Sequence, residues 1–468
     1  MIATLQPYQE YKESGLPWLS QMPAHWGIKR GKSVLQSIDQ RSATGQEELL
    51  TVSSARGIVP RRTASVTMFK AESYRGYKLC WPGDLVINSL WAWGGGLGVS
   101  RHHGIISSAY GVYRIRSGAP LIPNYIHELV RSSAFHWELQ VRSKGVWISR
   151  LQLTDISFLD APILLPPPSE QAAIVRFLDY ANGRLERAIR AKRKVIALLH
   201  EQKQAIIHRA VTRGLDPTVP LKHSGIPWLG DIPKHWAIVP LKFLCNRIQN
   251  GATPPSSEQQ YYENGTVPWF GPSSVGTASE LGTPVRHLNK AAFTDGKARL
   301  ISGPAMLVIV IGATAGKMGL LVGVGATNQK ITAFELKEGT VVPQFGIQQL
   351  RSSENWLKST ASTATIPILD SGIVNRLPVA FPACDEQQAI LSAISLQTQP
   401  LITAIDRLER EIELLREYRT RLVADVVTGK LDVRPAASHL PTPHTDMEPV
   451  ASVELEDAEV DEVEAIEQ

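Results

Sequence analysis

The sequence has few cysteines and no long hydrophobic stretch. Its 468 residues include only Cys80, Cys245 and Cys384, which are too few for a disulfide framework and too far apart for a metal knuckle. We therefore expect three buried thiols. No run of 18 or more apolar residues is present, and the N-terminus has neither a basic flank nor an apolar segment. These absences predict a cytoplasmic protein without a signal peptide or a membrane span.

Recognisable catalytic motifs are also missing. Residues 312–317 resemble a phosphate-binding loop, but the spacing is one residue short and Met318 stands where Ser or Thr would bind Mg²⁺. There is no G-x-S-x-G elbow, no H-E-x-x-H helix and no clustered set of metal ligands. The Asn/Asp-Pro-Pro-aromatic tetrapeptide of amino-methyltransferases is absent as well. We expect no catalytic residues and no metal site in this chain, which disfavours a stand-alone enzyme.

Acidic residues are scarce outside the C-terminus. Ten of the 44 acidic residues lie between Asp446 and Gln468, and no Lys or Arg follows Arg434, so residues 1–434 hold 34 acidic and 49 basic residues and a net charge of +15. Such a charge suits a polyanionic partner, although many basic proteins bind no nucleic acid. We expect a disordered solubilising tail. The alternative is a tail that covers the basic surface when DNA is absent.

What the sequence does contain is a duplicated framework. Residues 14–26 (SGLPWLSQMPAHW) match residues 224–236 (SGIPWLGDIPKHW). Two long helical stretches repeat as well, since Glu170-Gln171 and Glu386-Gln387 open them and Val-Thr-x-x-Leu-Asp closes each. The aromatic residues of the repeated motif, which we assign to core packing, are Trp18, Trp26, Trp228 and Trp236, with His25 and His235 beside them.

The two helical stretches carry apolar residues at heptad spacing. Ser169 provides a capping hydroxyl at the start of the first stretch, and Gly214 provides its stop. Pro400 in the second stretch and Asn182-Gly183 at nearly the same place in the first predict that each arm is a short helix followed by a longer one. The residues expected to pair the helices are Leu178, Leu185, Leu199, Ile206, Ile394, Leu401, Leu408, Leu415 and Leu422. The alternative is two helical hairpins, each packed on its own domain.

These patterns predict an α+β protein. Two mixed α/β target recognition domains, related by a pseudo-two-fold axis, would be separated by two long helices that form an antiparallel coiled coil. The expected segments are a first recognition domain at 1–168, a first spacer helix at 169–213, a second recognition domain at 214–384, a second spacer helix at 385–433 and the acidic tail at 434–468.

Each half has an insert in which an apolar strand leads into a polar, glycine-containing loop, at matching places. This suggests a common fold whose loops differ. Asn and Gln can bind adenine through two hydrogen bonds, whereas Arg and Lys can bind guanine or phosphate. The candidates for DNA contact are Arg56, Arg61, Arg62, Asn88, Trp91, Trp93, Arg101, Lys144 and Arg150 in the first insert, and Thr253, Trp269, Ser273, Lys317, Asn328, Gln329 and Lys330 in the second.

Taken together, these motifs resemble the specificity subunit of type I restriction–modification systems, over nearly all of residues 8–434. The resemblance is carried by the repeated SG(L/I)PWL…P-x-HW motif, by L-P-P-P-S-E-Q-x-x-I at 165–174 with its counterpart at 381–390, and by the V-T-x-x-L-D helix ends. Three features depart from the family pattern: Ala383-Cys384 in place of prolines, Pro400, and the acidic tail.

The resemblance implies a non-catalytic subunit of a restriction endonuclease and adenine DNA methyltransferase complex. Each recognition domain would read one half of an asymmetric bipartite site in double-stranded DNA. The helices would set the gap between the halves and dock two methylation subunits, and motor-nuclease restriction subunits would complete the complex. S-adenosylmethionine, ATP and Mg²⁺ would belong to those partners, with no cofactor in this chain. The alternative is a protein-binding scaffold that pairs partner subunits without reading DNA.

Overall fold

The computed structural model describes residues 5–64, 71, 73–145, 151–276, 280–361 and 367–441. The chain divides into two compact units. Unit 1 comprises Met1–Lys192 with Arg410–Gln468, and unit 2 comprises Arg193–Glu409. Each unit therefore includes part of both long helices, which the sequence analysis had treated as separate segments.

Unit 1 is built around a four-stranded antiparallel sheet. Its order is β4 (Leu35–Ser37), β11 (Gly111–Ile115), β8 (Leu85–Ile87), β9 (Leu97–Val99). Two-stranded pairs surround it: β1 (Tyr11–Leu16) with β2 (Leu19–Pro23), β3 (Gly27–Arg30) with β12 (Pro162–Leu165), β5 (Leu50–Ser53) with β6 (Gly57–Pro60), and β7 (Lys78–Cys80) with β10 (Gly104–Ile106). The short helices are α1 (Gly31–Val34), α2 (Pro123–Arg131), α3 (Ser133–Arg142) and α4 (Asp155–Leu159).

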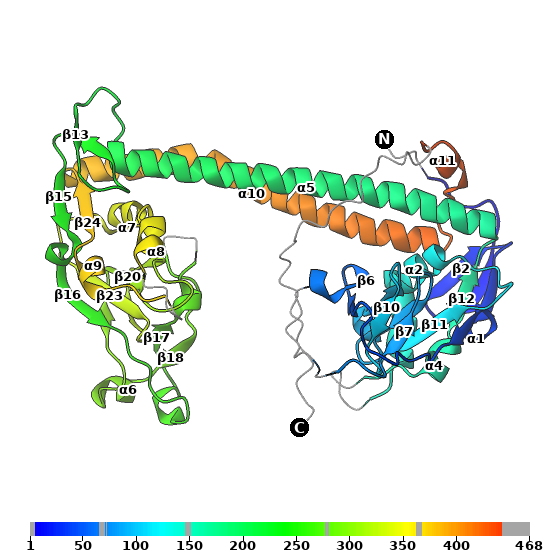
Figure 1. Cartoon of the computed structure of the whole chain (residues 1–468). Helices are drawn as coiled ribbons and strands as arrows, with labels where there is room; N and C mark the ends of the chain where they lie inside the picture. The colour runs from blue at the N-terminus through cyan, green and yellow to red at the C-terminus, as the bar shows by residue number, and fades with distance from the viewer. Residues whose placement is uncertain are drawn as a thin grey trace. The chain divides into compact units, whose positions relative to one another are not determined.

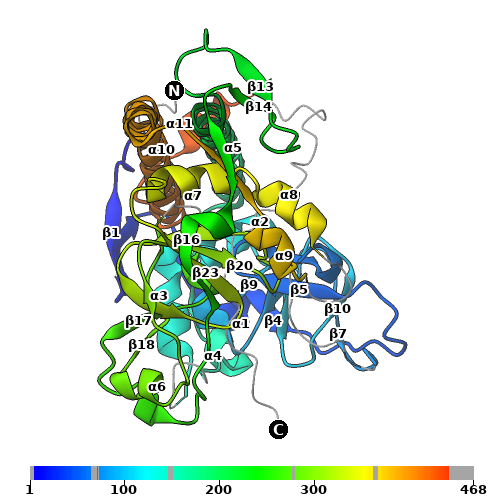
Figure 2. The same cartoon turned by 90° about the vertical axis from the view of Figure 1, so that its left-hand side faces the viewer.

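Unit 2 has a sheet of the same order. It runs β16 (Cys245–Asn250), β23 (Ile331–Leu336), β20 (Ala305–Ile309), β21 (Met318–Leu321), again antiparallel throughout. Helix α7 (Pro343–Arg351) packs on β20 and β21 (Figure 2). The other elements are β13 (Leu221–His223) with β14 (Asp231–Pro233), β15 (Ala237–Pro240) with β24 (Pro378–Phe381), α6 (Lys290–Thr294), α8 (Glu354–Thr360) and α9 (Ser371–Asn375). The shared strand order confirms the common fold predicted for the two inserts.

Unit 2 also contains a second sheet of four strands, in the order β18 (Arg286–Leu288), β17 (Val267–Phe270), β22 (Val324–Thr327), β19 (Ile301–Ser302). The pairing of β17 with β22 is parallel. The corresponding part of unit 1 has only two-stranded pairs within its described residues. The common fold therefore accommodates extra strands between the elements that the two units share.

Helix α5 (Pro168–Arg213) is one uninterrupted helix, so the predicted weak point at Asn182-Gly183 is wrong. The helix begins one residue before Ser169, because Pro168 occupies the first turn, where a missing N–H is tolerated. Ser169 is exposed and lies inside the helix rather than capping it. The predicted stop is confirmed, since Gly214 follows with a φ of 71°.

Helix α10 (Cys384–Val427) continues through Pro400, so the predicted break is also wrong. Pro400 cannot donate a hydrogen bond to the carbonyl four residues earlier. That carbonyl belongs to Leu396, whose side chain is 78% exposed, and Pro400 is exposed as well, so water can reach this side of the helix. Cys384, the first residue of the helix, is exposed too. Only Cys80 and Cys245 are buried, so the prediction of three buried thiols is wrong at Cys384.

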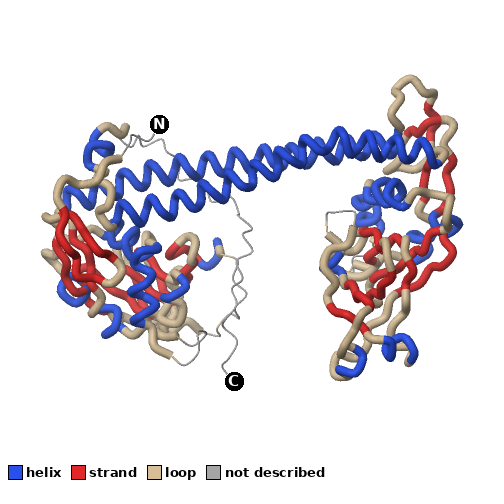
Figure 3. The backbone as a smooth tube through the Cα atoms, turned by 180° about the vertical axis from the view of Figure 1, so that it is seen from behind, coloured by secondary structure: helices blue, strands red, loops and turns tan. Residues whose placement is uncertain are grey.

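The two long helices pair antiparallel, as predicted (Figure 1 and Figure 3). In unit 1, Lys192 forms an ion pair with Glu411 at 2.5 Å, and Arg419 lies 3.8 Å from Glu186, so the numbering runs in opposite directions along the two helices. In unit 2, Ile207 and Ile394 belong to one core cluster. The alternative of two separate helical hairpins is therefore wrong.

None of the nine predicted pairing residues is exposed. The buried ones are Leu178, Leu185, Ile394 and Leu422. The half-buried ones are Leu199, Ile206, Leu401, Leu408 and Leu415. Lys192, which interrupts the apolar stripe in the sequence, is accommodated because Glu411 neutralises its charge at the helix surface.

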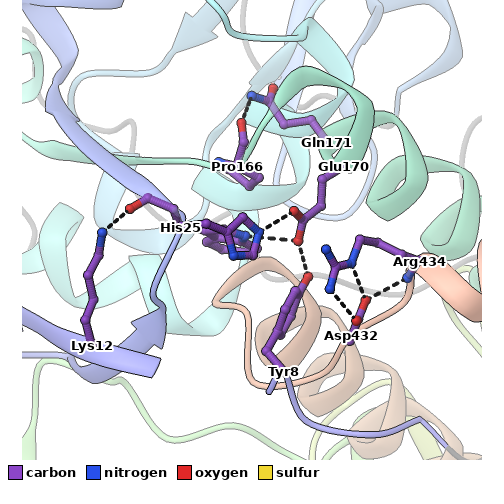
Figure 4. A network of polar contacts seen from close by, with 9 residues as sticks. Tyr8, Lys12, His25, Pro166, Glu170, Gln171, Asp432 and Arg434 are labelled. Carbon is purple, nitrogen blue, oxygen red and sulfur yellow. Dashed lines mark hydrogen bonds and ion pairs between the residues drawn. The ribbon is translucent and has the colours of Figure 1, made fainter. Parts of the chain in front are cut away.

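The repeated motif encloses the start of a long helix in each unit. In unit 1, the carboxylate of Glu170 accepts hydrogen bonds from the Trp26 indole at 3.0 Å and from His25 at 2.8 Å (Figure 4). In unit 2, Glu386 accepts from Trp236 at 3.1 Å and from His235 at 2.8 Å. A buried carboxylate at a helix N-terminus is stabilised by the helix dipole and by such donors.

Further bonds repeat with the same partners. Lys12 donates to the Trp26 carbonyl at 2.6 Å, and Lys222 donates to the Trp236 carbonyl at 2.5 Å. The predicted core role of the four tryptophans is confirmed: Trp26 and Trp236 are almost fully buried, and Trp18 and Trp228 pack against the core clusters of their units. The identical spacing in the two motifs therefore reflects identical contacts.

In unit 1, residues 6–8 and 432–434 complete this cluster. Asp432 donates its backbone N–H to the Gln6 carbonyl at 2.8 Å, Tyr8 donates its hydroxyl to Glu170, and the Arg434 guanidinium lies 4.9 Å from the Tyr8 ring (Figure 4). Burial and the Glu170 carboxylate raise the pKa of Tyr8 well above its usual range. In unit 2, the chain that follows the first long helix runs beside the matching cluster, because a Cβ at Gly214 would lie 3.6 Å from both the Glu386 carboxylate and the Trp236 indole.

The segment after α10 is structured for several residues. Helix α11 (Arg434–Ser438) buries Ala437 in the unit 1 core, next to Val433. The predicted disordered tail therefore does not begin at Arg434, because these small apolar side chains have a core to pack against. The ten acidic residues of the tail lie outside the described residues.

Candidate nucleic-acid interface

Three loops of unit 2 meet at one end of its β16-β23-β20-β21 sheet. The register pairs Asn250 with Thr332 and Ile309 with Ile331, so the end of β16, the start of β23 and the end of β20 are neighbours. We call the loops that extend from this end, residues 251–254, 310–317 and 328–330, loop cluster 2. It brings together five of the predicted DNA contacts, namely Thr253, Lys317, Asn328, Gln329 and Lys330.

Loop cluster 2 is held closely to its own backbone. Ala252 donates to the Thr327 carbonyl at 2.9 Å, and Gly251 donates to the Ile331 carbonyl at 3.0 Å. A Cβ at Gly251 would lie 2.2 Å from the Thr327 carbonyl, so only glycine fits this approach. The Trp269 indole donates to the Ala252 carbonyl at 3.1 Å. Trp269 is buried, so it braces the loop rather than facing a partner.

The remaining candidate of this unit, Ser273, is exposed in the turn that follows β17. The same stretch contacts the cluster, because Asn328 donates its backbone N–H to the Phe270 carbonyl at 3.3 Å. All seven candidates of unit 2 therefore lie at or beside one end of the sheet.

The matching end of the unit 1 sheet carries a different loop. Ile87 pairs with both Gly111 and Leu97, so the 88–96 loop and the 107–110 turn are neighbours. We call these two segments loop cluster 1. The Trp91 and Trp93 rings stack within it, with centroids 6.0 Å apart and planes at 13°. The Trp93 indole donates to the Leu90 carbonyl at 3.1 Å, which fixes the second ring.

The Asn88 side chain forms hydrogen bonds within loop cluster 1. Its amide nitrogen donates to the Tyr110 hydroxyl at 3.2 Å, and its amide oxygen accepts from the Leu90 backbone at 3.1 Å. Each end of the amide makes one hydrogen bond within the turn, which leaves one N–H and one oxygen lone pair for a partner, so the contact of Asn88 with a base edge stays a prediction. The following glycines let the chain wrap around Trp91, because a Cβ at Gly94 would lie 2.0 Å from its indole nitrogen.

Lys144 lies next to this loop. It is exposed and pairs through its backbone with Gln152, and the adjacent Leu153 donates to the Ser89 carbonyl at 2.9 Å. Arg150 lies outside the described residues. Loop cluster 1 therefore offers two indole rings, with an exposed lysine beside them.

The predicted arginines of unit 1 fall into two groups. Arg56, Arg61 and Arg62 belong to the β5–β6 hairpin and the turn after it. Arg56 donates to the Thr63 carbonyl at 2.8 Å, and Arg62 lies 3.0 Å from Glu48. Arg101 lies beyond the other end of β9 from loop cluster 1, so the structure does not bring it to the same place.

One residue that the sequence analysis missed joins the hairpin to loop cluster 1. The Arg131 guanidinium donates to the Leu97 carbonyl at 2.6 Å and to the Ala55 carbonyl at 3.0 Å. The neighbouring His127 accepts from the Val99 N–H at 3.0 Å, and burial, with Arg131 and Arg101 nearby, lowers its pKa to about 3. Neither contact has a signal in the sequence, because each joins residues far apart in the chain.

Metal sites and membrane spans are not found among the residues that the structure describes. No group of three or more His, Cys, Asp or Glu side chains there is placed to hold a metal ion. No helix in the described ranges is both long and apolar enough to cross a membrane.

Comparison with known proteins places these features in a family. Residues 233–414 match the family model described as type I restriction modification DNA specificity domain. The chain is 25% identical over 313 residues to the type I restriction enzyme MjaVIII specificity subunit of Methanocaldococcus jannaschii, across 63% of this chain and 68% of that protein. It is 24% identical over 282 residues to the EcoR124I/EcoR124II specificity subunit of Escherichia coli, across 58% and 62% of the two chains.

The fold agrees with these similarities. A solved chain, described with complex assembly and conformational transition of the type I R-M system, matches with a TM-score of 0.61 at 18% identity. The match covers 88% of this chain and 99% of that one. The resemblance inferred from the sequence is confirmed, because residues 233–414 match this family model and both relatives named above are specificity subunits of type I restriction enzymes.

Proposed function

We propose that the chain is the specificity subunit of a type I restriction–modification complex and reads double-stranded DNA through loop clusters 1 and 2. The observation that carries this proposal is the same sheet in both units with different loops at the same end. Loop cluster 1 offers indoles, whereas loop cluster 2 offers amides and lysines. Two dissimilar readers on one fold suit the two halves of an asymmetric bipartite site.

The charge of the chain supports a nucleic-acid partner. Residues 1–434 carry a net charge of +15, which favours a polyanion through counterion release. The partners would be methylation subunits and motor-nuclease restriction subunits, to which S-adenosylmethionine, ATP and Mg²⁺ would belong. This chain would supply target choice and assembly, in keeping with the lack of catalytic motifs in its sequence.

The long helices offer a matched pair of docking positions for two methylation subunits. Leu198 and Leu414 follow Glu170 and Glu386 by the same number of residues, and their side chains are 53% and 62% exposed. One leucine lies in unit 2 and the other in unit 1. Exposed leucines at equivalent positions of a repeat would give two copies of one partner the same apolar contact.

Exchange of one loop-bearing segment tests the reading function. Residues 27–165 would be replaced by the matching segment of another such subunit, and methylated adenines would be mapped in DNA from cells that express the complete complex. One half-site should change and the other should stay. Shortening both helices by one turn should alter only the gap between the half-sites. A change in the bases read after shortening would contradict this division of roles.

A salt titration separates DNA reading from the scaffold alternative. The complete complex is bound to target and non-target duplexes at increasing salt concentration. Direct reading predicts that log affinity falls steeply with log salt while one sequence remains preferred. Equal, weak binding of both duplexes would favour the scaffold.

A further inference from the structure

Amide side chains in loop cluster 2 are oriented by hydrogen bonds from within the loop. The Thr253 hydroxyl donates to the amide oxygen of Gln329. The backbone N–H of Lys330 donates to the amide oxygen of Asn328 at 3.1 Å. Each amide oxygen is thus turned toward a donor of its own loop, which fixes the orientation of the amide, and within the described residues no hydrogen bond involves either NH₂ group, which can only donate.

The other polar groups of this cluster are donors too. Lys330 is exposed and Lys317 is half-buried, and each ammonium group can donate but cannot accept. The two lysines flank the end of β20, because Ile309 donates to the Lys317 carbonyl at 2.9 Å and Val310 donates to the Lys330 carbonyl at 2.8 Å. Residues with amide and ammonium donors therefore lie at the same end of the sheet.

The backbone beneath these groups leaves little room for reorientation. Ala252 donates to Thr327 at the end of β22, Gly251 donates to Ile331 at the start of β23, and the Trp269 indole donates to the Ala252 carbonyl. Since Thr253 follows at once, its hydroxyl is held at the Gln329 amide. Polar groups held in this way lose little conformational freedom on binding.

Base pairs differ in the hydrogen-bond acceptors that they present to such donors. In the major groove, guanine offers two adjacent acceptors, N7 and O6, whereas adenine offers one acceptor and one donor. Bidentate binding of adenine by Gln needs the amide oxygen as well as the nitrogen. We propose that loop cluster 2 reads guanine, with the Gln329 NH₂ group as the reading donor and Thr253 as the positioning residue that excludes adenine. This inference rests on the proposed function.

The first experiment maps methylated adenines with the complete complex and three variants. Wild type should show a guanine in one half-site at a position where Gln329→Ala reduces methylation about tenfold, the usual weight of a specific base contact. Thr253→Val keeps the shape of the side chain but frees the amide oxygen, so adenine should become acceptable at that same position. Gln388→Ala, an exposed glutamine on α10, is the matched control and should change nothing.

The second experiment removes one acceptor from the DNA. Duplexes with 7-deazaguanine at the mapped position lack N7 and should bind the complete complex about tenfold more weakly, while 7-deazaguanine in the other half-site should leave the effect of Gln329→Ala unchanged. Thermal unfolding of each variant checks that the fold is retained.

The outcomes separate the two proposals. A half-site that responds to neither Gln329→Ala nor Thr253→Val, or that responds at a base other than guanine, overturns the guanine assignment while the other half-site still supports DNA reading. Absence of any sequence preference in the complete complex would overturn the proposed function itself.

Discussion

The two units show how one fold can carry two different surfaces. The Trp26–His25–Glu170 contacts of unit 1 recur in unit 2 with distances that agree within 0.1 Å. The loops at the sheet ends differ: the Trp91 and Trp93 indoles stack in one, and the Thr253 hydroxyl holds the Gln329 amide in the other. Residues that hold the long helices are thus repeated, whereas the residues that we propose to contact DNA differ. The predictions below test whether the shared clusters are equivalent and the loops independent.

The largest effect is expected at the buried tryptophans of the repeated motif. Trp26→Ala and Trp236→Ala should each destabilise their own unit by about 3–5 kcal/mol, since both indoles are almost fully buried. Hydrogen–deuterium exchange, read separately for each unit, measures the loss. A much smaller loss in one unit would show that the two clusters are not equivalent.

The two glutamates that accept hydrogen bonds from these tryptophans should contribute differently to stability. Glu170 is 3% exposed and also accepts from Tyr8, whereas the Glu386 side chain is 36% exposed. Glu170→Ala leaves two buried donors, the Tyr8 hydroxyl and the Trp26 indole, without a partner and should cost about 2–3 kcal/mol, while Glu386→Ala should cost about 1 kcal/mol. Urea denaturation followed by exchange in each unit distinguishes them. Equal losses of stability for the two variants would mean that the Tyr8 contact adds nothing to the unit 1 cluster.

Each unit has one buried cysteine whose raised pKa makes the stability of the folded protein depend on pH under alkaline conditions. Burial raises the pKa of Cys80 to about 11 and that of Cys245 to about 12, from an ordinary value of 9.0. The raised pKa stabilises the folded protein fully below pH 9, and this stabilisation, on the order of 2 kcal/mol for Cys80, is lost as the pH rises from 9 toward 11.

Alkylation with iodoacetamide at pH 8, read by mass spectrometry, checks the same difference between thiols. Cys384 is exposed and should react at once, whereas Cys80 and Cys245 should react only after unfolding. Rapid labelling of either buried thiol in the folded protein would contradict the core packing described above.

The smallest effect concerns loop cluster 1. Trp93→Ala removes one of two stacked rings from the surface and should weaken binding of the complete complex to its DNA about tenfold, the usual weight of one aromatic contact with a base. Methylation mapping should show the loss at one half-site only. Equal loss at both half-sites would indicate a general effect on folding or assembly rather than a reader confined to unit 1.

Much of the framework could be predicted because its signals are local. The repeated tryptophan motif, the Glu-Gln pair at each helix start and the glycine after Arg213 are each recognisable within a few residues, and the structure confirms them. The prediction of a helix break at Pro400 is wrong because local sequence does not show the surroundings of the residue. Its effect on a helix depends on whether solvent can reach the carbonyl left without a donor, and only the paired helices reveal that side.

The candidate contacts were predictable by residue type but not by role. Asn88 and Gln329 look alike in the sequence, yet both ends of the Asn88 amide are bonded within its loop, whereas Gln329 keeps its NH₂ group for a partner. The difference arises from Tyr110 and Thr253, which lie in loops next to β11 and β16 of the respective sheets. Arg101 was separated from the other candidates by the length of β9.

By itself, the sequence determined the duplication, the helix ends, the basic body and the lack of catalytic motifs, because these depend on composition and on residues a few positions apart. The tertiary structure alone decided which loops meet, which amide oxygens are bonded within them, and that residues 6–8 and 432–434 meet in unit 1. Those features require contacts between residues that are distant in the chain, and no spacing in the sequence specifies them.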